Sequence, residues 1–283
     1  MRIRAISMAL PGAVALSALC LPAAAQAAER PGATAGLDSF AARSVHPETS
    51  LGSMKFSKAV VNGGKDIVLG TTTKQSVTVT YTATSSSGVA LTEAFLWQGT
   101  DSSSPDTISG SLGTDDDPAC TESTTQTGVY ACKAVFHINA ASDLKNNGVA
   151  GTWKLFLGGF DLYADASYDD DVATTHIKKA SKLTADATPE PVKKGRTITV
   201  TGSLKRADWN KGTYTGYGRQ GVLLQYRKKG STTYTTLKKV TSSTSGALKT
   251  TTTATADGYY RFSFATNTTT AASTATGDYV DVK

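Results

Sequence analysis

The chain has 283 residues, a formal net charge of +6 and an aromatic content of 8%. Apart from an apolar leader, no segment is long and apolar enough for a membrane helix, which excludes a helical membrane protein. None of the three histidines lies in an H-E-x-x-H or G-x-S-x-G context, so the sequence lacks the signatures of zinc proteases and serine hydrolases.

Residues 1–27 have the pattern of a secretory signal peptide. Cys20 is a weaker alternative as the site of a lipid anchor, because Leu19 stands where a lipobox needs a small residue. We therefore expect a secreted, extracellular protein without a membrane span. The pattern consists of a basic start, an apolar middle and a small-x-small cleavage site: Arg2 and Arg4, residues 6–21, and Ala25-Gln26-Ala27.

The remaining residues, about 255 in number, are enough for two domains. Residues 28–50 are rich in Ala, Gly, Ser and Pro without periodicity, which predicts a disordered N-terminal segment. A change of charge near residues 174–187 divides the rest into an acidic domain, residues 51–178, and a basic domain, residues 179–283. The basic domain has 17 Lys and Arg against 6 Asp and Glu, a balance of +11, whereas residues 28–178 have 10 against 17, a balance of −7.

Polar and apolar residues alternate along several segments of the first domain, with the period of two expected for half-buried β-strands. We expect these strands to form a β-sandwich, with a single helical turn at residues 140–144. The apolar members of each set share one face of their strand: Val77, Val79 and Tyr81; Phe136 and Ile138; Trp153, Leu155 and Leu157.

Removal of the leader leaves two cysteines, Cys120 and Cys132, separated by a polar segment. Two cysteines in an exported chain are expected to pair, because no reducing system acts outside the cell. We expect a structural disulfide that clasps a hairpin or loop and contributes about 3 kcal/mol. No histidine lies at ligand spacing from them, which argues against a metal site.

Aspartates crowd the first domain before Cys120 and again near its end. Ca²⁺ takes six to eight oxygen ligands, and loops at the end of a sandwich can supply them, so calcium binding is an alternative hypothesis. The sequence contains neither an EF-hand loop nor a glycine-rich nonapeptide repeat. The candidate ligands are Asp161, Asp165, Asp169, Asp170 and Asp171.

The other titratable side chains give little support for catalysis. His137 alternates with apolar residues and should face away from the core, His46 lies in the N-terminal segment, and His176 lies near the domain boundary. Glu93 is the one carboxylate in an otherwise apolar strand, and we expect it to face outward or to pair with a lysine. We therefore expect no catalytic residue and no enzymatic activity.

The second domain shows the same alternation. In residues 195–202 Ile198 and Val200 share a face, which predicts a strand with one buried side. Residues 259–264 place three aromatic side chains on one face and three other side chains on the opposite face. The two sets are Tyr260, Phe262 and Phe264, and Tyr259, Arg261 and Ser263.

Residues 206–220 are interpreted as a long glycine-rich loop that carries aromatic and basic residues. Loops on a rigid scaffold carry recognition, and aromatic residues with arginine anchor interfaces, so this loop is the predicted contact surface. The alternative is that Trp209 packs beneath the sandwich. The candidate binding residues are Trp209, Tyr214, Tyr217 and Arg219.

Two stretches resemble immunoglobulin-like domains. Residues 128–132, Gly-Val-Tyr-Ala-Cys, are similar to the Tyr-x-Cys corner, but Cys120 is only twelve positions upstream, so the resemblance supports a sandwich and not an inter-sheet disulfide. In the second domain a pattern of core and turn residues runs through Gly195, Ile198, Val200, Gly202, Leu204, Gly221, Leu224, Tyr226, Gly246 and Gly258. This pattern resembles the C-terminal immunoglobulin-like module of secreted actinobacterial proteins. That resemblance implies export from a Gram-positive bacterium and a binding or scaffolding role, and it transfers no catalytic residue.

The sequence therefore predicts a secreted all-β protein of two tandem immunoglobulin-like β-sandwich domains that binds without catalysis. The charge of the second domain predicts attraction to an anionic cell-wall polymer, with an extracellular protein as the other expected partner and nucleic acid as a weaker one. The lysines can also serve only to keep the sandwich soluble. Further alternatives are a calcium-binding protein, a protease inhibitor that presents the clasped 120–132 loop, and a toxin-assembly component. The oligomeric state stays open.

Overall fold

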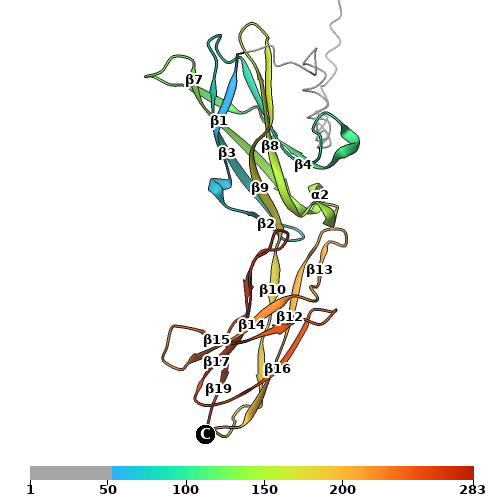
Figure 1. The fold of residues 1–283 in the computed structure, drawn as a ribbon, viewed down its shortest axis with the longest axis vertical. Coiled ribbons are helices and arrows are strands. Elements are labelled where there is room, and N and C mark those ends of the chain that lie inside the picture. Colours follow the sequence, from blue (N-terminus) through green and yellow to red (C-terminus); the bar gives the residue numbers. More distant parts are fainter. Residues whose placement is uncertain (1–52) are drawn as a thin grey trace, which may run out of the picture. The chain divides into compact units, whose positions relative to one another are not determined.

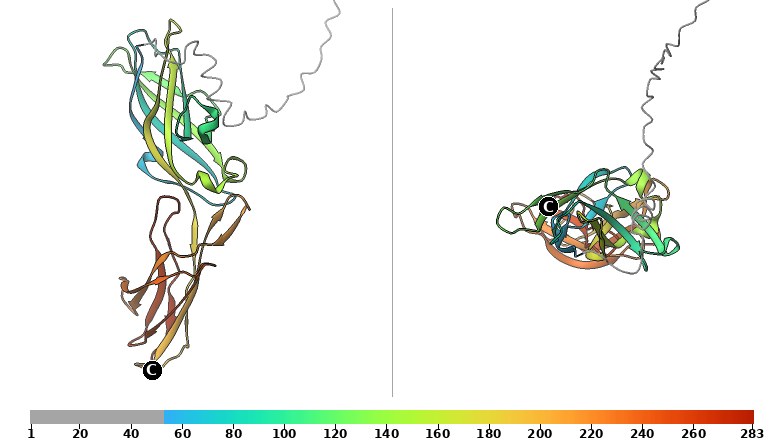
Figure 2. Two further views of the ribbon diagram at one scale, coloured as in Figure 1. Left: turned by 45° about the vertical axis from the view of Figure 1, so that its right-hand side comes forward. Right: turned by 90° about the horizontal axis from the view of Figure 1, so that it is seen from above.

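The structure is a computed structural model and describes residues 53–283. Its regular structure is almost entirely β-strand, and the helical turns are short segments between strands (Figures 1 and 2). The signal peptide predicted at residues 1–27, the N-terminal segment predicted at residues 28–50, and His46 lie outside the described residues. No helix in the described part of the chain has the length and apolar character needed to cross a membrane.

The strands from β1 to β9 form a sandwich of two sheets. One sheet has the order β1–β3–β7–β6 and the other the order β2–β9–β8–β4–β5. β2 and β9 run parallel, and the other pairs are antiparallel. The strands are β1 (Lys55–Val61), β2 (Ile67–Leu69), β3 (Lys74–Thr84), β4 (Leu91–Gly99), β5 (Ile108–Gly113), β6 (Ala119–Glu122), β7 (Val129–Asn139), β8 (Gly151–Phe160) and β9 (Ala166–Lys179).

The strand order makes this first sandwich immunoglobulin-like. β1, β3, β7 and β6 take the places of strands A, B, E and D, and β9, β8 and β4 take the places of G, F and C. The chain therefore crosses between the two layers several times, as in a Greek key. The first domain has the predicted fold class.

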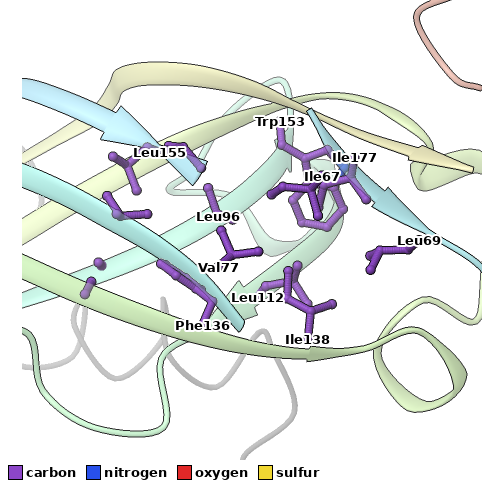
Figure 3. Close-up of a cluster of buried hydrophobic side chains, with 14 of the residues drawn as sticks. Ile67, Leu69, Val77, Leu96, Leu112, Phe136, Ile138, Trp153, Leu155 and Ile177 are labelled. Atoms are coloured by element: carbon purple, nitrogen blue, oxygen red, sulfur yellow. The ribbon is translucent and has the colours of Figure 1, made fainter. Parts of the chain in front are cut away.

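The core of the first sandwich lies between its two sheets. Figure 3 shows Val77, Phe136 and Ile138 from one sheet and Leu96 and Leu155 from the other, with their side chains directed into this space. Each side chain is fully or almost fully buried. Alternation in the sequence predicted most of these positions, because successive side chains on a strand point to opposite faces.

Two smaller predictions for the first domain are confirmed. A helical turn, α2 (Ala140–Asp143), follows β7, and the side chain of Asn139 caps it by accepting a hydrogen bond from the Ala141 amide. Cys120 in β6 lies directly opposite Cys132 in β7, and the two form a disulfide. The disulfide clasps one hairpin within one sheet and does not join the two layers.

The second sandwich is also immunoglobulin-like. β12 pairs with β11 and β16 to form one layer, and the other layer has the order β15–β14–β17 with β19 beside β17. The far half of β12 continues past this layer and pairs with β10 and β13. The strands are β10 (Ser181–Leu183), β11 (Asp186–Thr188), β12 (Thr197–Asp208), β13 (Thr213–Gly216), β14 (Gly221–Lys228), β15 (Thr235–Thr241), β16 (Ala247–Thr253), β17 (Gly258–Phe264), β18 (Ser273–Thr274) and β19 (Asp278–Val280).

The second core contains the apolar faces that the sequence predicted. Ile198 and Val200 from β12 pack with Tyr260, Phe262 and Phe264 from β17, all of them buried. The opposite face of β17 therefore points away from this core, and Tyr259 and Arg261 lie on that outer face.

Candidate functional site

Residues 206–220, expected to be a loop, are mostly β-hairpin. The segment begins within β12, turns at residues 209–212 and returns as β13, and Asp208 pairs with Thr213 across the hairpin. The expectation of a long loop is therefore wrong. Period-two alternation is weak here, because Gly212, Gly216 and Gly218 interrupt it.

Trp209 at the turn of this hairpin packs into the core of the first sandwich. Only 5% of the residue is exposed, and it belongs to the same apolar cluster as the core of β3, β7 and β8. Its indole Nε1 donates to the Gly70 carbonyl at 2.9 Å, and its backbone amide donates to the Asn147 side chain at 2.9 Å. Trp209 is therefore unavailable to an external ligand, as the packing alternative predicted.

The other predicted contact residues have mixed positions. Tyr217 is buried in the second core, with the Arg206 guanidinium 4.0 Å above its ring. Tyr214 is half-buried, and the Lys182 ammonium lies 4.0 Å from its ring centre. Arg219 is exposed and has a φ of 60°. A binding role for Tyr214 and Arg219 stays a prediction.

Two consecutive lysines, Lys178 and Lys179, stand at the end of β9, and the second of them lies beside Trp209. Lys178 is buried and pairs with Asp66 at 2.7 Å, and its ammonium also donates to the Thr266 hydroxyl at 3.1 Å. Lys179 is 3% exposed, and its ammonium lies 5.4 Å from the Trp209 ring centre. Burial, with a smaller contribution from nearby Arg206, lowers the pKa of Lys179 to about 8.

Asn147 links the first sandwich to the hairpin. Its Nδ2 donates to Asp208 at 2.6 Å, and this hydrogen bond lowers the pKa of that carboxyl. Its backbone amide donates to the Asn210 side chain at 2.8 Å. We call the set Gly70, Asn147, Lys178, Lys179, Asp208 and Trp209 the joint, because its contacts connect strands of the first sandwich with the β12–β13 hairpin and residues 266–271 of the second.

The aspartates considered for calcium serve the local backbone. Asp161 is buried, and its carboxylate accepts hydrogen bonds from the amides of Tyr163 and Asp165 in the β8–β9 turn. Asp170 accepts from Ser102, and its carbonyl accepts from the Trp97 indole.

The remaining acidic candidates also have partners or stand apart. Asp171 lies 3.6 Å from Lys154, and Asp169 accepts a hydrogen bond from the Asp171 amide. Within residues 53–283 no group of three or more His, Cys, Asp or Glu is arranged to hold a metal ion. Calcium binding at these residues stays a prediction.

The histidines in the described chain pair with aspartates at the surface. His137 faces away from the core and lies 3.1 Å from Asp115. His176 lies 3.4 Å from Asp66, beside a hollow of about 270 Å³. The hollow is lined by two threonines but by no serine or cysteine. Threonine is therefore the one residue type beside the His–Asp pair that could act as a nucleophile through a hydroxyl or thiol.

Glu93 is buried on the outer face of its sheet, beside an apolar cluster. It alternates with Ala94 and Leu96 of the inner core and shares its face with Phe95 and Trp97. The expectation that it points away from the sandwich core is correct, but the residue is buried, on the face that carries these aromatic side chains. The sequence signal for this second apolar layer was the apolar run from Ala94 to Trp97 in β4.

The outer face of the second sandwich carries a set of side chains that the binding prediction missed. Tyr279, Tyr259 and Arg227 are direct cross-strand neighbours on β19, β17 and β14. In the next row Arg261 lies opposite Gln225, and its Nε donates to the Gln225 side chain at 2.9 Å. These strands form one continuous sheet (Figure 1).

The cations and rings of this face stack in alternation. The Arg227 guanidinium lies 4.1 Å from the Tyr259 ring centre and 5.2 Å from that of Tyr234, and Arg261 lies 3.6 Å from the Tyr234 ring centre. Tyr259 and Tyr279 pack with ring centres 5.2 Å apart. Lys229 lies 5.4 Å from the Tyr279 ring centre and extends the series. We call Arg227, Lys229, Tyr234, Tyr259, Arg261 and Tyr279 the tyrosine–cation ladder.

The ladder is accessible, unlike the joint. All of its rings and both guanidiniums are partly exposed, and Lys229 is largely exposed. Within residues 53–283, the acidic side chain that forms an ion pair with the ladder is Asp257, 3.6 Å from Lys229. Alternation in the sequence already placed Tyr259 and Arg261 on an outward face. The pairing that aligns them with Arg227 and Tyr279 depends on strand order, which local patterns do not give.

Comparison with known proteins gives structural similarity only. No protein-family profile matches the chain, and no curated protein matches its sequence. Among solved structures, the D00-D0 domain of intimin has 16% identity and a TM-score of 0.26, with 78% of this chain and 98% of that chain covered.

Two further structures show similarity at the same level. FdeC, an Escherichia coli adhesin, has 16% identity and a TM-score of 0.29, with 82% of this chain and 66% of that chain covered. A putative membrane-anchored protein from Corynebacterium diphtheriae has 10% identity and a TM-score of 0.29, with 81% and 57% covered. These similarities are too weak to assign a function, and the immunoglobulin-like arrangement follows from the strand order itself.

Proposed function

We propose that the protein is a secreted, non-catalytic binding protein whose second sandwich attaches it to an anionic cell-wall polymer. The observation that carries the proposal is the concentration of positive charge in residues 179–283, where the balance is +11, together with the accessible ladder on one sheet face. A charge of this size in about a hundred residues raises the local concentration of polyanions by its long-range field.

The described side chains favour binding over catalysis. His137 and His176 each pair with an aspartate near the surface, and no serine or cysteine lines the hollow beside His176. The buried polar groups of the joint are engaged in contacts between the sandwiches. The surfaces left for function are the outer sheet faces and the loops.

The joint suits a scaffold role. An indole inserted into the neighbouring core, the hydrogen bond from Lys178 to the Thr266 hydroxyl and the Asn147 hydrogen bonds link the two sandwiches, and only one residue separates β9 from β10. Two domains of one chain usually move relative to each other unless the interface between them is large and apolar. Here the apolar contact, made by Trp209, is part of the core of the first sandwich, so we expect this motion to be restricted.

Sedimentation with purified cell walls tests the proposal. The chain from Ala28 should pellet with walls at about 50 mM NaCl, and its affinity should fall about 10–20-fold by 200 mM, since about three phosphate contacts give a salt slope near −2. Walls stripped of their phosphate polymers are the matched control and should retain little of the protein. Binding that changes neither with the salt concentration nor with removal of the phosphate polymers would contradict the proposal.

A second candidate function, contact with an extracellular protein, is favoured by the β8–β9 turn. Leu162 and Tyr163 are 70% and 79% exposed at this turn, while the buried Asp161 carboxylate holds the turn's backbone amides. Two exposed apolar side chains on a preorganised turn are typical of a protein contact. Capture of secreted proteins should be lost with the Leu162→Ser/Tyr163→Ser variant and kept with Thr244→Ala, a substitution in another exposed turn; equal capture by both variants would remove this candidate.

A further inference from the structure

We propose that the tyrosine–cation ladder is the binding site of the second sandwich, and that its ligand is a linear phosphodiester polymer of the teichoic acid type. The inference rests on the proposed function and deepens it by naming the site and the ligand chemistry. Three observations carry it: the spacing of the cations, their fixation by rings, and the donors that the guanidiniums keep within the described residues.

The cations are arranged in series along the face. Arg227 lies on β14, Arg261 lies on β17 one row away, and Lys229 follows the end of β14 beside Tyr279 of β19. Neighbouring strands lie about 5 Å apart. A polymer that crosses these strands therefore meets positive charges at intervals, and a charge that repeats along the polymer fits them better than a single anion does.

The rings hold the guanidiniums in place. Arg227 is flanked by Tyr259 and Tyr234, and its Nη1 also donates to the Ser231 carbonyl at 2.6 Å. Arg261 stacks on Tyr234 and donates from Nε to Gln225. Side chains fixed in this way lose little conformational entropy when they bind a ligand, which is the basis of preorganised recognition.

The guanidiniums keep donors for an anion. Arginine has five N–H donors, and the Nε bond of Arg261 leaves those of Nη1 and Nη2 without a recorded partner in the described chain. A guanidinium fork matches the paired oxygens of a phosphate. Asp257 is occupied by Lys229, the Val282 amide and the Tyr279 hydroxyl, so its charge is largely compensated.

The stacking favours a wall polymer over a nucleic acid. Proteins that hold single-stranded nucleic acid offer aromatic faces on which bases stack. In the ladder those faces are used by the cations, at 3.6 Å for Arg261 on Tyr234 and 4.1 Å for Arg227 on Tyr259. What the ladder presents is a row of charges, which suits a backbone of phosphates joined by small polyols.

Titration with purified poly(glycerol phosphate) teichoic acid tests the site. In the Arg227→Gln/Arg261→Gln variant we expect affinity at 50 mM NaCl to fall at least about 10-fold, and the slope of log affinity against log salt to weaken by about 1.4, two thirds of its full value of about 2. The matched control is Lys193→Gln/Lys194→Gln, which removes the same charge from an exposed turn of the same sandwich and should change affinity less than about 2-fold. Melting curves confirm that both variants fold.

A charge-preserving variant separates the site from the general field. Arg227→Lys/Arg261→Lys keeps the charge but loses the fork and the planar stacking, so we expect a 3–10-fold loss with the salt slope retained. Equal losses in the ladder and Lys193/Lys194 variants would overturn the inference and leave the proposed function in place, because the field alone would then explain binding. Failure of the unmodified protein to bind walls or teichoic acid would overturn both.

Two further ligands complete the test. Polygalacturonate, a carboxylate polymer, and single-stranded DNA should bind at least about 5-fold more weakly than teichoic acid at the same salt. Equal or tighter binding of polygalacturonate, with competition against teichoic acid, would contradict the phosphodiester assignment. The same result with single-stranded DNA would contradict the choice of a polyol phosphate over a nucleic acid.

Discussion

The joint and the ladder use the same pairing of aromatic rings with cations but differ in what surrounds the pairs. In the joint, Lys179 lies over Trp209 and both are almost fully buried. In the ladder, Arg227 and Arg261 lie over tyrosines on an accessible sheet face. Sequence clusters of aromatic and basic residues therefore do not identify a contact surface, since burial decides whether they join two domains or bind a ligand.

The largest expected difference between the two regions is in stability. Trp209→Ala removes a large side chain from a packed core and should lower the free energy of unfolding by about 3–5 kcal/mol. Urea unfolding followed by circular dichroism measures this loss. We also expect a single transition to become two, because the variant uncouples the sandwiches. A loss below 1 kcal/mol would show that the indole does not fill the first core.

Loss of the disulfide should destabilise the first sandwich without acting on the joint. The bond closes a loop with a sequence separation of 12, and Cys120→Ser/Cys132→Ser should cost about 3 kcal/mol. Urea unfolding should show the early transition of the first sandwich, while hydrogen exchange at the Trp209 amide stays slow in the folded state. Fast exchange there would mean that the clasp also maintains the joint.

Lys179, buried in the joint, makes the stability of the protein depend on pH. The pKa of Lys179 is about 8 in the folded state and about 10.5 in the unfolded state, so between these values the unfolded chain binds more protons and stability rises with pH. Lys179→Met should raise stability at pH 7 by about 1–2 kcal/mol, since the cation–π contact offsets part of the burial cost.

Thermal melts between pH 7.5 and 9.5 measure this effect. Above pH 10 the trend should reverse, because burial raises the pKa of Tyr81 and Tyr260 to about 12, and ionisation then favours the unfolded chain. Lys182→Met, which removes an accessible lysine over Tyr214, is the control and should leave the slope unchanged. If the melting temperature of the Lys179→Met variant rises with pH as steeply as that of the unmodified protein, the assignment of this rise to Lys179 is wrong.

The smallest expected effect on stability belongs to the ladder. Tyr234→Ala removes the ring between Arg227 and Arg261 but opens no core, so it should cost about 0.5–1 kcal/mol. The same substitution should weaken binding to teichoic acid about 3-fold, because both guanidiniums lose a stacking partner. A large loss of stability with unchanged binding would make the ladder structural.

Local patterns predicted the fold better than the site. Alternation placed Ile198, Val200 and the aromatic face of β17 in the core, and it placed Tyr259 and Arg261 outside, because that pattern depends only on neighbouring residues. It did not show that Trp209 enters another domain's core or that Arg227 lies beside Tyr259. Both facts depend on contacts between distant segments, which a single sequence does not encode in any local period.

Resonances of the arginine side chains report which of the two regions binds the polymer. In ¹H–¹⁵N spectra of the full mature chain, titration with teichoic acid should shift the Nε–Hε signals of Arg227 and Arg261. The signal of Arg206, which stacks on the buried Tyr217 beside the joint, should stay in place. Shifts at Arg206 equal to those at the ladder would contradict the assignment of polymer binding to the ladder and of inter-domain contact to the joint. So would the absence of shifts at Arg227 and Arg261 in a protein that binds the polymer.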